Sequence, residues 1–184
     1  MSSAAFKFYA TIQEYGANEA IAEGKAWYPN AWKECQRISK MSNLTPERVA
    51  AIVSITSPRA RWSVNVTAAM MIAMDASVPE FKRRKNYGIL DANARKAILA
   101  SEDRYYSRLV TGPKVTDFYL NILGHTEPVT VDSLMSKCAG YGGNVTKRIR
   151  DEVTAGCRSI ADVFDVTPRD AQAAVWIAFR GGAS

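Results

Sequence analysis

The sequence predicts an all-α protein. Apolar residues recur at spacings of three and four over most of the chain, which is the periodicity of helices with one buried face. Proline, glycine, serine and threonine interrupt this pattern at regular intervals, where helices begin and end. Strand-like residues are few, since the clearest β-branched run covers only residues 128–131. From ordinary connection lengths we expect about eight to ten short helices.

Threonine–proline pairs predict two helix starts, because threonine caps a helix and proline suits its first position. The pair at 45–46 begins one helix, which Ser-Pro at 57–58 ends, and the pair at 167–168 begins another. Asp91 is expected to cap a helix over 91–100. The expected apolar stripes are Val49, Ile52 and Val53 in the first helix, Val66, Ala69, Met70 and Ala73 in the following one, and Ala171, Ala174, Val175, Ala178 and Phe179 in the last.

The composition limits the class of protein. With 184 residues, 47% of them hydrophobic, the chain suffices for one domain or for two small lobes with a buried core. A net charge of +6 favours a polyanionic partner. Apolar runs such as 68–74 are too short to cross a bilayer. The first residues also lack the pattern of a secretory signal peptide, in which a charged stretch is followed by an apolar one. We therefore predict a cytoplasmic protein with no membrane partner.

Cysteine and histidine usage argues against a metal or disulfide scaffold. Cys35, Cys138 and Cys157 are odd in number and scattered, unlike a disulfide framework or the close pairs of a zinc site. Iron–sulfur clusters usually take four thiolates. His125 is the single histidine and lies in a turn-like stretch, which disfavours a Ser-His-Asp triad. We predict no metal and no cofactor.

The segment 108–124 carries the residues best suited to chemistry. Gly112 permits a tight turn, Pro113 starts a helix and Gly124 ends it. Lys114 therefore falls in the first helical turn, where backbone N–H groups attract anions and disfavour a cation. A less protonated amine is a better nucleophile. The expected buried face of this helix consists of Val115, Phe118, Tyr119 and Ile122.

This segment resembles the hairpin of the helix-hairpin-helix DNA glycosylases, the superfamily of endonuclease III and the oxoguanine glycosylases. Gly112, Pro113 and Lys114 match the G-x-K end of the hairpin motif, and residues 129–132 match the stretch that brings the catalytic aspartate. Lys114 and Asp132 are 18 positions apart, close to the spacing in that family. The resemblance implies that Lys114 attacks the sugar C1′ to form a Schiff base and that Asp132 assists departure of the base.

Residues 50–66 resemble the early helix, loop and next helix of the same family. The resemblance implies that the loop over residues 57–62 contacts the DNA helix at the position of the extruded base. Its arginines would contact phosphate or the minor groove, and its tryptophan would wedge or stack. The alternative is an ordinary exposed turn with a packing tryptophan. With the hairpin's own residues, the predicted DNA-binding set is Ser57, Arg59, Arg61, Trp62, Thr111 and Gly112.

The chain departs from the family pattern in the hairpin and after the aspartate. Leu109 and Val110 stand where the family has proline and glycine, and because valine resists positive φ we expect an altered phosphate-binding turn. Ser133 stands where the family has histidine, and the cysteine set of an iron–sulfur cluster is missing. These differences fit a divergent member of viral or mobile-element origin.

We expect a two-lobed helical array of the helix-hairpin-helix DNA glycosylase type. A helical domain would cover 45–137, a second lobe would combine 1–44 with 138–184, and the site would lie between them. The resemblance implies a monomeric DNA N-glycosylase, with or without AP-lyase activity, acting on double-stranded DNA with an extruded base. It would work in the cytoplasm, on the nucleoid or in a virus-infected cell. The alternatives are an enzyme of this fold that processes hypermodified thymine or another pyrimidine in viral DNA, and a non-catalytic helix-hairpin-helix DNA-binding module.

The candidate residues also have structural interpretations. Lys114 is then a solvated lysine at a helix start. Asp132 is then an N-cap, which is compatible with catalysis because capping N–H groups hold a carboxylate in one orientation. The basic run 82–85 is expected to be a solvated loop rather than a phosphate-binding patch. Three tryptophans are expected in the core: Trp27, Trp32 and Trp176.

Overall fold

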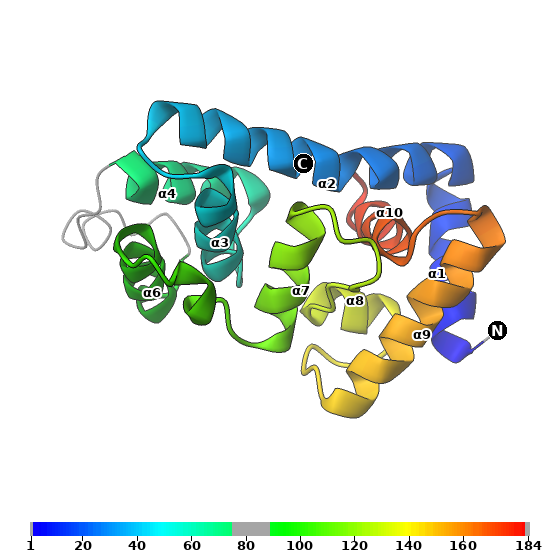
Figure 1. Cartoon of the computed structure of the whole chain (residues 1–184). Coiled ribbons are helices and arrows are strands. Elements are labelled where there is room, and N and C mark those ends of the chain that lie inside the picture. Colours follow the sequence, from blue (N-terminus) through cyan, green and yellow to red (C-terminus); the bar gives the residue numbers. More distant parts are fainter. Residues whose placement is uncertain (1, 75–88, 183–184) are drawn as a thin grey trace. The chain divides into compact units, whose positions relative to one another are not determined.

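The computed structural model describes residues 2–74 and 89–182 and confirms the all-α class (Figure 1). These residues form nine α-helices and one 3-10 helix, η1, and no strand. None of the helices in this described part is long and apolar enough to pass through a bilayer. The elements in chain order are α1 (Ser3–Tyr15), α2 (Ala17–Met41), α3 (Pro46–Thr56), α4 (Trp62–Met74), α6 (Asp91–Glu102), η1 (Tyr106–Leu109), α7 (Pro113–Ile122), α8 (Ser133–Cys138), α9 (Lys147–Phe164) and α10 (Pro168–Arg180).

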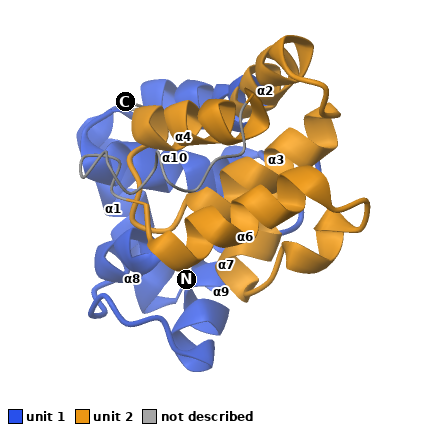
Figure 2. Ribbon diagram, turned by 90° about the vertical axis from the view of Figure 1, so that its left-hand side faces the viewer, with its two compact units in different colours: residues 1–30, 124–183 blue, residues 31–123, 184 orange. Residues whose placement is uncertain are grey.

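The chain divides into two compact units (Figure 2). Unit 1 combines residues 1–30 with residues 124–183, and unit 2 is built from the continuous segment Ala31–Leu123. The first division falls within α2, next to Pro29, whose ring nitrogen cannot donate a helical hydrogen bond. Helices from both ends of the chain therefore share the core of unit 1.

The bounds of the units differ from the expected 45–137. The central unit takes in the last part of α2 and ends with α7. The residues that follow belong to the core of unit 1, where Val129, Val131 and Met135 are all buried. This packing assigns Asp132 to unit 1 rather than to the central segment.

Helix α3 is the centre of unit 2. Thr45 caps it as predicted, because its hydroxyl accepts a hydrogen bond from Arg48 N at 3.4 Å, and Pro46 is its first residue. Every residue from 49 to 56 is buried, and α3 packs against α4, α6, α7 and η1. A helix that is largely apolar on all sides is stable only when other elements surround it. Figure 1 shows α3 among these helices.

The buried face of α4 is one residue away from the predicted face. The predicted stripe was Val66, Ala69, Met70 and Ala73. The buried residues are Asn65, Ala68, Ala69 and Ile72. The prediction was wrong because it excluded a polar residue from the core. Asn65 is buried with two partners: its Oδ1 accepts from Thr56 Oγ1 at 2.5 Å, and its Nδ2 donates to Val53 O at 3.1 Å.

Helix α6 starts differently from the prediction. Leu90 occupies the N-cap position, and no side chain caps the helix. Asp91, the predicted cap, is the first helical residue, where its negative charge still suits the positive end of the helix dipole. The basic run 82–85 lies outside the described residues.

Helix α10 starts as predicted, but its buried face differs. The hydroxyl of Thr167 accepts from Asp170 N at 3.1 Å. Phe179, expected in the apolar stripe, is exposed, whereas Asp170 and Gln172 are buried. Burial of Asp170 is compensated by Arg169, whose Nε donates to its Oδ1 at 3.0 Å. Polar pairs formed in the folded chain therefore shift the face away from the apolar pattern.

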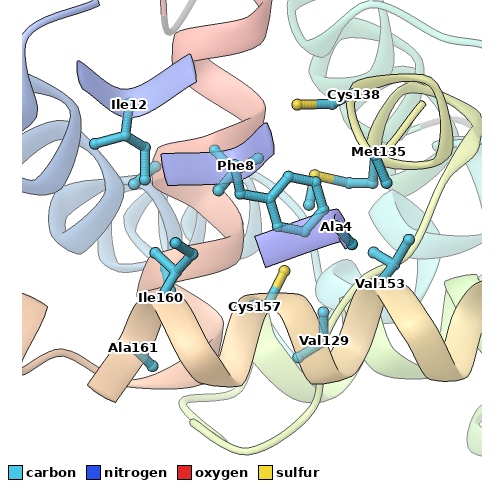
Figure 3. Packing of buried hydrophobic residues seen from close by; sticks show 14 of the residues in the cluster. Ala4, Phe8, Ile12, Val129, Met135, Cys138, Val153, Cys157, Ile160 and Ala161 are labelled. Carbon is cyan, nitrogen blue, oxygen red and sulfur yellow. The ribbon is translucent and has the colours of Figure 1, made fainter. Parts of the chain in front are cut away.

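Phe8 lies at the centre of the core of unit 1. Its ring is fully buried and is surrounded by side chains of α8 and α9, as Figure 3 shows. Helices α1 and α9 approach closely at Gly156, where a Cβ atom would lie 3.0 Å from Phe8 Cε2. The core cluster also includes Ala4, Ile12, Val129, Met135, Val153, Cys157 and Ile160.

The three cysteines, Cys35, Cys138 and Cys157, are buried free thiols. Burial raises the pKa of Cys35 to about 12, and it raises the pKa of Cys157 as well. Because the thiolate is the reactive form, these side chains are poor nucleophiles near neutral pH. They act as small apolar residues of the cores.

Replacing Gly24 with alanine is expected to destabilise unit 1, although alanine is the better helix former. A Cβ at Gly24 would lie 2.7 Å from the carbonyl oxygen of Asp170 and 2.8 Å from Ala174 N. These are backbone atoms, so relief requires α2 and α10 to move apart. Overpacking costs about 1–3 kcal/mol, against a gain of about 1 kcal/mol in helix propensity. Chemical denaturation measures the difference in the free energy of unfolding.

Gly142→Ala is the matched control, because a Cβ there meets nothing within 4 Å. Equal losses of unfolding free energy in the Gly24 and Gly142 variants would contradict the prediction.

Candidate functional site

The predicted hairpin turn forms between η1 and α7 in unit 2. Gly112 has a φ of 87°, a left-handed value that favours glycine, and Pro113 is the first residue of α7. Val110 has a φ of −78°, so the turn does not require glycine where the family motif has one. Thr116 N donates to Gly112 O at 3.0 Å and closes the first helical turn. Gly124, with a φ of 100°, follows the end of the helix as predicted.

Lys114 is the second residue of α7, and its side chain is half-buried. Thr111 and Gly112 beside it are exposed, and Thr111 Oγ1 accepts a hydrogen bond from Lys96 Nζ of α6. The hairpin therefore brings together three of the predicted site residues. The buried residues of α7 are Phe118, Asn121 and Ile122, while Val115 and Tyr119 are only partly covered.

The loop between α3 and α4 is a tight turn that holds Arg59 in a strained conformation. Ala60 N donates to Ser57 O at 3.3 Å, and Arg59 between them has a φ of 65°. This is a position where turns favour glycine, and a left-handed non-glycine residue costs about 1–3 kcal/mol. Such residues cluster at functional sites. The strain keeps Arg59, which is exposed, a candidate for ligand contact.

The other residues of this loop have different environments. Arg61 is exposed, and Trp62 is half-buried as the first residue of α4. Ser57 is nearly buried, and its hydroxyl donates to Ser54 O at 2.9 Å. Ser57 therefore shapes the end of α3, and the exposed cations of the loop are Arg59 and Arg61.

Asp132 is the N-cap of α8 in unit 1, which confirms the capping interpretation. Its Oδ1 accepts hydrogen bonds from Leu134 N and from Met135 N, both at 2.9 Å. Its Oδ2 accepts from Trp176 Nε1 at 3.3 Å. Both oxygens are thus engaged, which fixes the plane of the carboxylate, and the residue remains half-buried.

The indole of Trp176 is itself held in place. The guanidinium of Arg180 lies 4.4 Å from its ring centroid, and Trp27 of α2 meets it edge-on at 5.9 Å. Trp27 packs edge-on against Tyr28 at 4.8 Å. The tryptophans were expected in the core, but Trp27, Trp176 and Trp32 are each half-buried. A large ring with one polar N–H suits a boundary position better than a core position.

Tyr28 fixes the extended segment that leads to Asp132. Its buried hydroxyl donates to Gln172 Oε1 at 2.7 Å and lies 3.1 Å from Thr130 Oγ1. The guanidinium of Arg169 lies 5.7 Å from the tyrosine ring centroid. Because Thr130 is two residues before Asp132, this network helps to set where α8 begins.

Lys114 and Asp132 belong to different units. Lys114 lies in the first turn of α7 in unit 2, the unit that also holds the loop arginines, and Asp132 caps α8 in unit 1 beside Trp176. Within residues 2–74 and 89–182, no group of three His, Cys, Asp or Glu side chains gathers as metal ligands would.

A family model matches residues 8–183, and its description is a family of unknown function, DUF7178. The chain belongs to the DUF7178 family. Comparison of this DUF7178 chain with curated proteins and with solved structures found no match.

The DUF7178 chain has site residues that sequence reasoning missed. Trp176 lies 44 positions from the aspartate that it contacts, and no local pattern links the two. Trp27 is more distant still. The contact between Arg180 and Trp176 could have been predicted, because residues four positions apart lie next to each other on a helix. Lys96 contacts the hairpin threonine across 15 positions, in a stretch read only as a helix.

Proposed function

We propose that this chain is a DNA N-glycosylase with Lys114 and Asp132 as its catalytic pair. It would act on double-stranded DNA, extrude a modified or damaged base, and cleave the bond between base and sugar. The observation that carries the proposal is the anchoring of the Asp132 carboxylate by two backbone N–H groups and the Trp176 indole. The anchored carboxylate belongs to Asp132, the residue to which the glycosylase resemblance assigns a catalytic role.

A fixed carboxylate suits this reaction because the sugar becomes positive in the transition state. As the base leaves with the bonding electrons, charge develops at C1′. A preorganised carboxylate stabilises that charge without having to reorient. Attack by the Lys114 amine forms a C1′–N bond, and opening of the sugar ring then gives the Schiff base. Attack by water in its place gives simple hydrolysis.

The surface of unit 2 supports DNA binding. The hairpin at Gly112 exposes the start of α7, an end of a helix that attracts phosphate. Arg59 and Arg61 add exposed positive charge. Extruding a base costs a few kcal/mol, which phosphate contacts and a wedge at Trp62 would offset.

The proposal includes the finer expectations of the resemblance. The fold would be the two-lobed glycosylase type, working as a monomer without a cofactor. The protein would act on DNA in the cytoplasm, on the nucleoid or in a virus-infected cell. The non-catalytic module and the pyrimidine-processing enzyme are outcomes of the test below.

Borohydride trapping tests the catalytic assignment. The protein is incubated with duplex oligonucleotides that carry abasic sites and damaged or hypermodified bases, and the mixture is then reduced. We expect a covalent protein–DNA adduct that disappears in Lys114→Ala. Lys40→Ala, which removes an exposed lysine of unit 2, is the control and should form the adduct normally.

Other outcomes overturn the proposal in distinct ways. DNA binding without adduct or base release over the whole panel would indicate the non-catalytic module. Replacement of the base without strand cleavage would indicate the pyrimidine-processing enzyme.

A further inference from the structure

Two arginines share one exposed tyrosine ring beside the hairpin. The guanidinium carbon of Arg104 lies 4.7 Å from the Tyr105 ring centroid, and that of Arg108 lies 4.6 Å from it. Both arginines are exposed, and the tyrosine is 46% exposed. We call these three residues the arginine–tyrosine surface. It belongs to unit 2 and to the segment that leads into the hairpin.

The segment that carries this surface is firmly attached to its unit. Tyr106, the next residue, lies under the guanidinium of Arg48, with 5.1 Å between the guanidinium carbon and the ring centroid. Arg48 also donates to Ser101 O at 3.2 Å. Burial raises the pKa of Tyr119 of α7, and the neighbouring Tyr106 raises it further, so Tyr106 lies close to α7. Adjacent tyrosines thus have opposite roles: Tyr106 anchors η1, and Tyr105 faces solvent.

The two arginines of this surface are not paired with acidic side chains of the described residues. Within the described residues, neither Arg104 nor Arg108 forms an ion pair, whereas Arg37 of the same unit pairs with Glu34 at 2.9 Å. Asp103 is close in sequence, but its Oδ1 accepts from Tyr105 N at 2.8 Å. A cation–π contact at an exposed site is worth only about 0.5–1 kcal/mol, so it leaves each guanidinium able to bind an anion.

We propose that the arginine–tyrosine surface binds the phosphodiester backbone of duplex DNA. A planar guanidinium can bind phosphate through two N–H groups at once, and both guanidinium groups are exposed and outside any ion pair among the described residues. Because the tyrosine ring holds both arginines, less side-chain entropy is lost on binding. Lys96, whose Nζ donates to the exposed Thr111, adds a further positive charge at the hairpin. The proposal rests on the proposed DNA-directed function and extends its interface beyond the hairpin and the α3–α4 loop.

Fluorescence anisotropy with a short duplex oligonucleotide, over a range of salt concentrations, tests the proposal. In Arg104→Gln/Arg108→Gln we expect the affinity for the duplex to fall at least about tenfold. The plot of the logarithm of the association constant against the logarithm of salt concentration should become less steep, its negative slope shrinking in magnitude by about 2. The glutamines keep much of each side chain, and a thermal melt checks that the variant is folded. Arg37→Gln/Lys40→Gln is the control, since it removes the same charge from the same unit.

The outcomes separate this proposal from the catalytic one. Equal losses in the two double variants, or no loss in either, would overturn the arginine–tyrosine surface as a DNA contact. If the arginine variant lost affinity for duplex RNA but not for duplex DNA, the surface would bind RNA and the proposed DNA ligand would be wrong. DNA binding that depends on the arginine pair, without base release on any substrate, would sustain the surface and refute the glycosylase. Base release by the protein, with unchanged DNA binding in the arginine variant, would support the glycosylase and refute the arginine–tyrosine surface.

Discussion

In the proposed reaction, Asp132→Asn is expected to reduce base release by about 10²- to 10³-fold while leaving the fold intact. Asparagine is about as good an N-cap as aspartate, so its side-chain oxygen can still accept from Leu134 N and Met135 N. What it lacks is the negative charge that would stabilise the developing positive sugar, and its Nδ2 cannot accept the hydrogen bond that Trp176 Nε1 donates to Asp132 Oδ2. Single-turnover release of base from duplex DNA measures the effect.

Asp132→Ala separates the two roles of the side chain. Alanine removes the cap as well as the charge, so it should lose a further ~1 kcal/mol of stability that the asparagine variant keeps. Equal activity in the wild type and in Asp132→Asn would remove Asp132 from the catalytic pair, whatever its effect on α8.

Phe8→Ala is expected to give the largest loss of stability, about 3–5 kcal/mol. The ring is 0% exposed and lies where α1 meets α8 and α9, so its removal leaves a cavity lined by residues from both ends of the chain. For a chain of this size the melting temperature should fall by roughly 2–4 °C for each kcal/mol. Calorimetry or a circular dichroism melt measures the shift.

Phe6→Ala is the control on the same helix. Phe6 is 68% exposed, so its loss leaves no internal cavity and should change the melting temperature little. A similar shift for both variants would show that the core of unit 1 is not organised around Phe8.

Local chemistry explains which parts of the fold could be predicted from sequence. The starts of α3 and α10 depend on a threonine cap that bonds an amide three residues later, so Thr45 and Thr167 carry their own signal. The turn at Gly112 is equally local. Asp132 as a cap follows the same rule, because the two amides that donate to its Oδ1 lie within three residues of it.

The faces of α4 and α10 could not be predicted in this way. Asn65 can be buried because Thr56 and Val53 supply its hydrogen bonds. Gln172 can be buried because its Oε1 accepts a hydrogen bond from the Tyr28 hydroxyl, 144 positions away in sequence. Apolar periodicity contains no information about such partners. The contact between Trp176 and Asp132 was missed for the same reason, since it forms only when α10 packs beside α8.

The observed capping role of Asp132 and its proposed catalytic role together have an evolutionary consequence. Selection can retain an acidic side chain at this position for the sake of helix α8, for the sake of chemistry, or for both. Natural variation to asparagine would preserve the helix start and abandon the charge. Under the proposed function, lineages of the family that have asparagine at this position would keep the start of helix α8 and lack the glycosylase reaction.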